Sequence, residues 1–216
     1  MMEKFDTNDV QVLLKVAKIN SLKFLDTMIC YYNKIFQISS EETRTIYMKI
    51  GDTQSAKRDF DGAIRAYKKV LKADPENIDA LLRLGKTYMD LGLPNEASES
   101  LKKLVVLDTA SSEGYYLLGS AMFILDEKQT AIEALQRAIE LKAGYADAYY
   151  KLGLVYDSMS DHDKAIEAYE KTIAFKQDFI RAYQSIGLAY EGKGLRDEAV
   201  KYFKKALEKE EKNAKY

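Results

Sequence analysis

Residues 146–179 read ADAYYKLGLVYDSMSDHDKAIEAYEKTIAFKQDF, and this stretch decides the fold. Two apolar-rich segments flank the polar turn DSMSDH, and each contains a small residue, Gly153 in the first and Ala165 in the second. Large apolar side chains stand beside the small residues at helical spacing, namely Tyr149, Leu152, Tyr156 and Tyr169. The pattern predicts two antiparallel helices that approach closely where the small residues lie.

The same skeleton recurs along the chain at one constant spacing. An Ile-Gly or Leu-Gly pair returns at Ile50-Gly51, Leu84-Gly85, Leu118-Gly119, Leu152-Gly153 and Ile186-Gly187. An alanine follows every one of these glycines at the same separation, at Ala63, Ala97, Ala131, Ala165 and Ala199. Five copies at one spacing, without an insertion, predict an array of helix–turn–helix units that grows along one axis.

This pattern resembles the tetratricopeptide repeat, a helix–turn–helix unit of about 34 residues. The aromatic residue that the family has at position 4 of the unit is present at Tyr47, Tyr115, Tyr149 and Tyr183 and is replaced by Leu81. The resemblance implies an all-α, right-handed superhelical solenoid, with first helices lining a concave face and second helices a convex one. We expect repeats at 44–77, 78–111, 112–145, 146–179 and 180–213, after an N-terminal lead of residues 1–43 and before a tail of residues 214–216.

The lead contains an apolar segment, residues 10–37, that reads as two helices separated by Asn20-Ser21. It lies within a span of one more repeat length, 10–43, with Ala17 at the position of a small residue, but its other positions do not match the repeat. We interpret it as a degenerate repeat. Four lysines are interleaved with its apolar side chains.

Composition and charge exclude several classes of function. The formal net charge of -1 argues against a protein that binds nucleic acid by neutralising phosphates. No apolar run approaches the ~18–20 residues needed to span a bilayer, and the first residues lack the form of a secretory signal. A single cysteine, Cys30, allows no internal disulfide. We therefore expect a cytosolic protein.

Catalytic, metal and cofactor chemistry is not indicated. The one histidine, His162, lies in the predicted turn of the fourth repeat and reads as a solvated residue. Cys30 lies in an apolar segment and reads as a packing residue. The sequence contains no glycine-rich phosphate loop or cluster of metal-ligand residues. We expect no enzymatic activity, no metal and no cofactor.

The family resemblance places a peptide-binding surface at positions 2, 5, 9, 12 and 13 of each unit, on the concave face. Its apolar members here are Met48, Leu82, Met89, Tyr116, Phe123, Ile124, Tyr150, Leu154 and Leu188. Its charged members are Asp52, Asp79, Asp90, Glu113, Asp147, Asp157 and Glu191, with Lys86 and Arg181 as the cations. Apolar side chains ringed by carboxylates favour a protein or peptide partner with apolar anchors and basic residues. The alternative is that the carboxylates serve solvation and the aromatic residues pack between repeats.

The lead matches the charge preference of this surface. We hypothesise that it docks into the concave face of a second copy, so that copies close into a ring or continue as a chain. The self-assembly residues would be Leu13, Lys15, Lys18, Leu22, Lys23, Leu25 and Lys34. The layout of lead and repeats also resembles one member of the family, which implies a self-assembling cytosolic scaffold that coats an organelle membrane only indirectly, through a membrane-bound protein.

Two alternatives stay open from the sequence. The chain could be a monomeric adaptor that binds a peptide of an unrelated pathway. It could also bind a membrane surface directly through residues 10–37, whose lysines flank apolar side chains.

Overall fold

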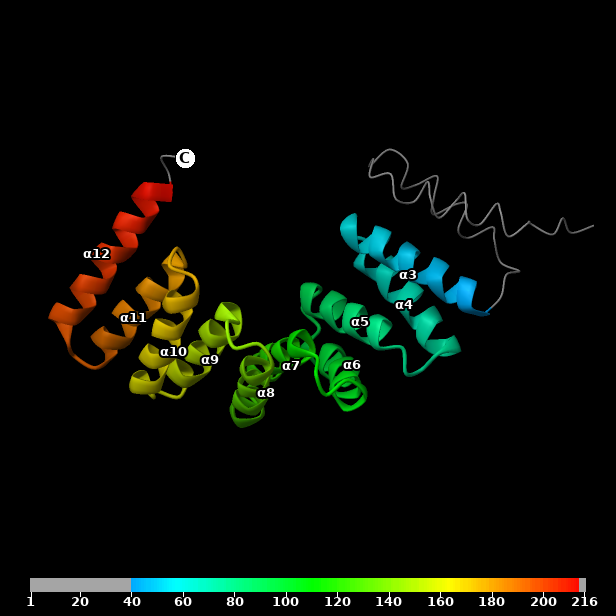
Figure 1. Cartoon of the computed structure of the whole chain (residues 1–216), viewed down its shortest axis with the longest axis horizontal. Coiled ribbons are helices and arrows are strands. Elements are labelled where there is room, and N and C mark those ends of the chain that lie inside the picture. The colour runs from blue at the N-terminus through cyan, green and yellow to red at the C-terminus, as the bar shows by residue number, and fades with distance from the viewer. Residues whose placement is uncertain (1–39, 214–216) are drawn as a thin grey trace, which may run out of the picture. The chain divides into compact units, whose positions relative to one another are not determined.

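The computed structural model describes residues 40–213, and every regular element in that range is an α-helix (Figure 1). The chain divides into two compact units, Met1–Leu93 and Pro94–Tyr216. Unit 1 contains α3 (Ser40–Ala56), α4 (Phe60–Ala73) and α5 (Ile78–Asp90). Unit 2 contains α6 (Pro94–Leu107), α7 (Ser112–Ile124), α8 (Lys128–Leu141), α9 (Ala146–Ser158), α10 (His162–Phe175), α11 (Ile180–Gly192) and α12 (Arg196–Asn213). The predicted all-α architecture is confirmed, and the predicted helices of residues 10–37 lie outside the described range.

Helices that follow one another in the chain pack side by side within each unit. In unit 1, α4 contacts both α3 and α5. In unit 2, each helix from α6 to α11 contacts the next, and α7 also contacts α9, its counterpart one repeat later. Contacts between neighbours in the chain are what a stacked array of repeats predicts. Between residues 40 and 213, no helix is long and apolar enough to cross a bilayer.

First and second helices approach each other at the repeated glycines. A Cβ atom built on Gly153 would lie 2.4 Å from Cε1 of Tyr169, and one built on Gly51 would lie 2.3 Å from Cε1 of Tyr67. Since both distances are shorter than any real Cβ contact, a larger residue does not fit without movement of the ring. The sequence placed Ala165 opposite Gly153, but the nearest atoms belong to Tyr169, one helical turn later.

The turn inside each repeat contains one residue with a left-handed backbone. These residues recur at the repeat spacing and have φ angles of 63° at Arg58, 76° at Gly92, 61° at Asp126, 59° at Ser160 and 77° at Gly194. Left-handed backbone costs a non-glycine residue about 1–2 kcal/mol, so three of the five turns carry this strain. The position in the repeat, and not the type of residue, therefore determines the left-handed conformation.

The core around α10 and α11 positions the residues of the first helices. Tyr169, Ala182 and Ile186 are fully buried there, at 0% exposure. Tyr150 and Leu154 of α9 pack against this cluster and stay only partly buried. Full burial of a large apolar side chain stabilises a fold by about 1.5–3 kcal/mol, so the cluster holds α9 firmly against its neighbours.

Candidate functional site

All residues predicted for the concave face lie on first helices, and none of them is buried. In unit 1, α3 carries Met48 and Asp52, and α5 carries Asp79, Leu82, Lys86, Met89 and Asp90. In unit 2, α7 carries Glu113, Tyr116, Phe123 and Ile124, α9 carries Asp147, Tyr150, Leu154 and Asp157, and α11 carries Arg181, Leu188 and Glu191. We call the surface that α7, α9 and α11 form with these side chains the first-helix face.

Apolar side chains are prominent on the first-helix face. Ile124 is 61% exposed and Leu188 is 56% exposed. Aromatic pairs recur at equivalent positions in successive repeats. The ring centroids of Tyr116 and Tyr145 are 5.1 Å apart, and those of Tyr150 and Phe179 are 4.8 Å apart. Paired rings are rigid, so they can contact a partner with little loss of side-chain freedom.

Carboxylates lie beside the first of these aromatic pairs. Burial raises the pKa of Tyr145 to about 12, and the nearby Tyr116, Glu113 and Asp147 add to the effect. Burial is also the main cause that raises the pKa of Tyr116, followed by Asp147. The acids add to the effect of burial, so negative charge lies near both phenols, and the Lys142 ammonium group already lies over the Tyr145 ring, 4.4 Å from its centroid. The structure thus brings together Glu113, Tyr116 and Asp147 of the predicted set.

One predicted carboxylate of unit 1 is already engaged within the chain. Oδ1 of Asp52 accepts a hydrogen bond from the Tyr67 hydroxyl at 2.9 Å and another from Nη1 of Arg83 at 2.7 Å. Local sequence patterns do not reveal this group, because Arg83 is distant from Asp52 in the chain and belongs to the next repeat. Asp52 therefore offers a partner less negative charge than the sequence alone suggested.

Asp157, on the first-helix face, is engaged by the histidine. His162 begins α10, and its Nδ1 donates a hydrogen bond to Oδ1 of Asp157 at 2.8 Å. The imidazole is only 26% exposed and packs against Gly192, where an added Cβ would lie 2.8 Å from Nε2. The interpretation of His162 as a solvated turn residue is therefore wrong, because the ring turns back onto α9 and α11.

Because of this contact, we expect His162→Ala to have a measurable effect on stability. The substitution removes one hydrogen bond and the packing on Gly192, and should lower the free energy of unfolding by about 1 kcal/mol. Urea unfolding followed by circular dichroism measures the change. In an Asp157→Ala background the cost should be smaller, because the partner of the hydrogen bond is gone. Equal costs in both backgrounds would show that the bond to Asp157 contributes nothing.

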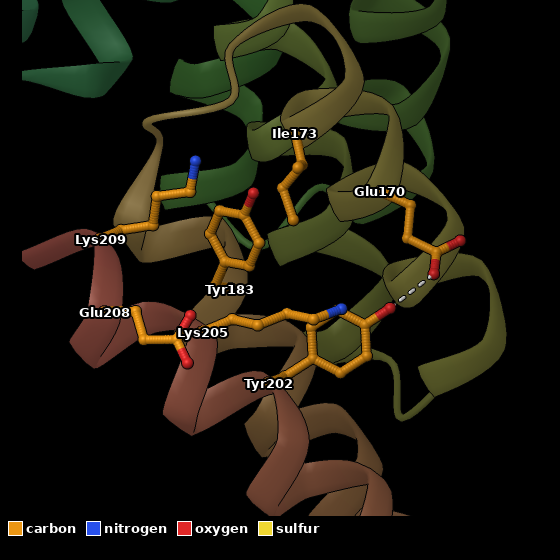
Figure 2. Close-up of a pocket in the computed structure, with 7 residues that line it drawn as sticks. All are labelled: Glu170, Ile173, Tyr183, Tyr202, Lys205, Glu208 and Lys209. Atoms are coloured by element: carbon orange, nitrogen blue, oxygen red, sulfur yellow. Dashed lines mark hydrogen bonds between the residues drawn. The ribbon is translucent and has the colours of Figure 1, made fainter.

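Two hollows lie away from the predicted residues. One, of about 260 Å³, is formed by α10, α11 and α12, where the Tyr202 hydroxyl donates to Oε1 of Glu170 at 3.0 Å (Figure 2). The other, of about 270 Å³, is formed by α8, α9 and α10. Their linings share four positions of the repeat: Tyr183 and Tyr149, Lys205 and Lys171, Glu170 and Gln136, and Tyr202 and Ala168. Because the hollows recur with the repeat, we interpret them as products of helix stacking.

Residues 40–213 contain no group of three or more His, Cys, Asp or Glu side chains arranged to hold a metal ion. Cys30 and the predicted self-assembly residues of the lead lie outside the described part of the chain. The chemistry that the described surface offers is therefore recognition through apolar contacts, hydrogen bonds and negative charge.

Comparisons with known families identify the repeat. Models described as tetratricopeptide repeat match residues 48–120, 146–179 and 180–213. A further model, described as TPR repeat, matches residues 127–160. Together these matches extend over most of the described chain.

Individual proteins similar to this chain include MamA and the BBSome member BBS4. A crystal structure of a protein named MamA is 79% identical, with a TM-score of 0.76, and the match covers 82% of this chain and 96% of that one. A second MamA crystal structure is 80% identical, with a TM-score of 0.75, over 77% of this chain and 98% of that one. The BBSome complex member BBS4 of Bos taurus is 30% identical over 105 residues, which are 43% of this chain. The match spans only 20% of the length of BBS4.

Proposed function

The chain belongs to the tetratricopeptide repeat family, and we propose that it is a non-enzymatic scaffold that self-assembles and binds partner peptides on its first helices. The observation that carries this proposal is the chemistry of the first-helix face. Exposed Ile124 and Leu188, the rings of Tyr116 and Tyr150, and the carboxylates of Glu113 and Asp147 lie on consecutive first helices. Each of the two rings pairs with the ring that directly precedes the next first helix, Tyr145 or Phe179. A surface of this kind suits a polypeptide with apolar anchors and basic side chains.

The proposed repeats are those expected from the sequence, 44–77, 78–111, 112–145, 146–179 and 180–213, preceded by the lead of residues 1–43 and followed by the tail 214–216. In this organisation the lead supplies the basic and apolar side chains, and the first helices of another copy receive them. The scaffold is thus a homo-oligomer with a head-to-tail contact.

The likeness to MamA supports a location for the scaffold. MamA is the magnetosome-associated protein of magnetotactic bacteria that the layout of lead and repeats resembles, and the identity of 79% extends over nearly all of the MamA chain. We propose that this chain is cytoplasmic and peripheral to the magnetosome membrane. It would reach that membrane indirectly, through a magnetosome membrane protein, and would need no cofactor and bind no nucleic acid.

Charge reversal on the first-helix face tests the proposed binding surface. The double variant Glu113→Lys, Asp147→Lys should weaken binding of a fluorescently labelled synthetic peptide of residues 10–37 by about tenfold or more, since like charges then face the peptide lysines. Fluorescence anisotropy, with protein that lacks residues 1–43, measures the affinity. The loss should shrink at high salt, because screening reduces the repulsion.

The matched control reverses two carboxylates on second helices of the same repeats. Glu133 of α8 and Glu167 of α10 are exposed, so Glu133→Lys, Glu167→Lys makes an equal change of net charge on the other side of each helix pair. This variant should bind the peptide nearly as well as the unmodified protein. Equal losses in the two variants would remove the case for the first-helix face.

A further inference from the structure

A tyrosine hydroxyl inside unit 2 lacks a hydrogen-bond partner. The Tyr169 side chain is 0% exposed, and its Oη makes no hydrogen bond with any of residues 40–213. Buried polar groups are nearly always paired, so an unpaired one calls for a physical explanation. Tyr169 lies beneath Tyr150 of the first-helix face, with ring centroids 5.6 Å apart.

Unit 1 contains the same tyrosine position with its partners present. Tyr67 lies three repeats before Tyr169, and its hydroxyl donates to Oδ1 of Asp52 at 2.9 Å. Nη1 of Arg83 donates to the same oxygen at 2.7 Å. A phenol, a carboxylate and a guanidinium thus form a closed polar group between two repeats of unit 1.

At the equivalent positions of unit 2, the tyrosine is present but the arginine is absent. Ser185 stands at the repeat position of Arg83, and Leu154 stands at that of Asp52. A carboxylate is nevertheless near, because Asp157, one turn further along α9, is among the causes that raise the pKa of Tyr169, after burial. The Ser185 hydroxyl acts in the opposite direction and lowers that pKa, although it does not meet the geometry of a hydrogen bond with Oη of Tyr169. Asp157 accepts the hydrogen bond of His162 with Oδ1, and its side chain is 31% exposed, so a further donor can reach the carboxylate.

We propose that Tyr169, Ser185 and Asp157 form a binding site for the guanidinium group of an arginine side chain from a bound partner protein. This guanidinium group has the role of Arg83 in unit 1. It donates hydrogen bonds to the carboxylate of Asp157 and to the hydroxyl oxygens of Tyr169 and Ser185. The inference rests on the proposed function, since it requires a polypeptide on the first-helix face. Residues 1–43 contain no arginine, so this arginine comes from another protein and not from the lead of a second copy.

Tyr150 covers the proposed arginine site until the arginine side chain of the partner protein enters. Its hydroxyl lies 3.4 Å from Oγ of Ser185, which is longer than a good hydrogen bond between hydroxyls. Turning the ring aside therefore breaks little, and the ring can then lie against the planar guanidinium. Lysine is a poorer guest because its compact ammonium group lacks the planar fork of donors.

The direct test uses small probes with the full chain. Saturation-transfer difference NMR is recorded with Nα-acetyl-arginine methylamide and with the matching citrulline derivative, which has nearly the same shape and no charge. The arginine probe should bind about tenfold more tightly, because hydrogen bonds to charged groups are the stronger ones. Equal binding of the two probes, or no transfer to the arginine probe, would overturn the proposal.

Ser185→Arg places the side chain of unit 1 at the same position in unit 2. It should raise the melting temperature and abolish binding of the arginine probe, because the new guanidinium occupies the place itself. Gln184→Arg is the matched control, since Gln184 is the exposed neighbour of Ser185 on α11. It adds the same charge and should change neither property. If the two variants behave alike, the subsite does not exist.

Tyr169→Phe keeps the proposal testable if Ser185→Arg fails to fold. It should weaken binding of the arginine probe by about 2- to 10-fold without lowering the melting temperature, because the lost hydroxyl had no partner. Tyr67→Phe should lower the melting temperature, because that hydroxyl is bonded. Unchanged probe binding by Tyr169→Phe would overturn the subsite.

The two proposals fail in different ways. If the arginine probe binds as described but Glu113→Lys, Asp147→Lys does not affect the peptide of residues 10–37, the subsite stands and the proposed peptide surface is wrong. If the charge reversal weakens the peptide but the probes do not distinguish arginine from citrulline, the surface stands and the subsite is overturned.

Discussion

Gly153→Leu should lower the stability of unit 2 by about 3 kcal/mol or more, the upper range for overpacking a core. A Cβ atom at this position would lie 2.4 Å from the Tyr169 ring, and that ring is fully buried among α9, α10 and α11. The ring cannot turn aside without opening the contact between the two repeats. Urea unfolding followed by circular dichroism should show an earlier transition, or a separate early phase from unit 2.

The same substitution at Gly144 is the control. Gly144 is exposed in the turn before α9, and a Cβ atom there would lie 3.7 Å from the Phe175 ring, an ordinary van der Waals distance. Gly144→Leu should therefore change stability by no more than about 0.5 kcal/mol. If both variants unfold at the same urea concentration, the close approach at Gly153 does not limit the fold.

The repeat architecture was predictable because one spacing is repeated without interruption. The glycine pairs predicted both the helix–turn–helix fold and the tetratricopeptide family, which the family models confirm. The identity of the atoms at the close contact was not predictable, since Ala165 and Tyr169 both lie on the side of α10 that faces α9. In the structure, the Tyr169 ring and not the Ala165 methyl group covers Gly153.

The left-handed turns were not predictable from the sequence for a different reason. Sequence patterns find such backbone through glycine, but Arg58, Asp126 and Ser160 occupy the position in three turns. Packing of the flanking helices imposes the conformation, and the side chain at the turn has little influence on it. A rule based on the residue type at the turn therefore misses a backbone conformation that the surrounding contacts determine.

The sequence predicted on which helices the surface residues lie, but not which of them are already bonded to other side chains of the chain. The family pattern placed them all on first helices, where the structure has them, unburied. It did not show that Asp52 is bound to Arg83 or that Asp157 is bound to His162. Both contacts join side chains whose partners depend on helix packing and side-chain rotamers, which the sequence pattern does not determine.

Removal of residues 1–43 should convert a large assembly into a folded monomer. The lead carries Lys15, Lys18, Lys23 and Lys34 among apolar side chains, and the first-helix face offers apolar contacts beside carboxylates. Without the lead, that face has no binding segment from a second copy. The deletion shortens α3 to residues 44–56, and the helices of residues 44–213 keep their packing with one another within each unit. Size-exclusion chromatography with light scattering should give the monomer mass, and the helical circular dichroism should persist.

The full chain should form a concentration-dependent assembly that dissociates as salt rises, because the contact pairs lysines with carboxylates at the protein surface. A full-length variant with the four lysines changed to glutamine separates charge from length. It should assemble more weakly than the unmodified chain and lose most of the salt dependence, because the apolar part of the contact remains. If the truncated protein assembles as well as the intact one, the lead is not the connector. The second helices then become the better candidate, since they present the opposite side of each helix pair.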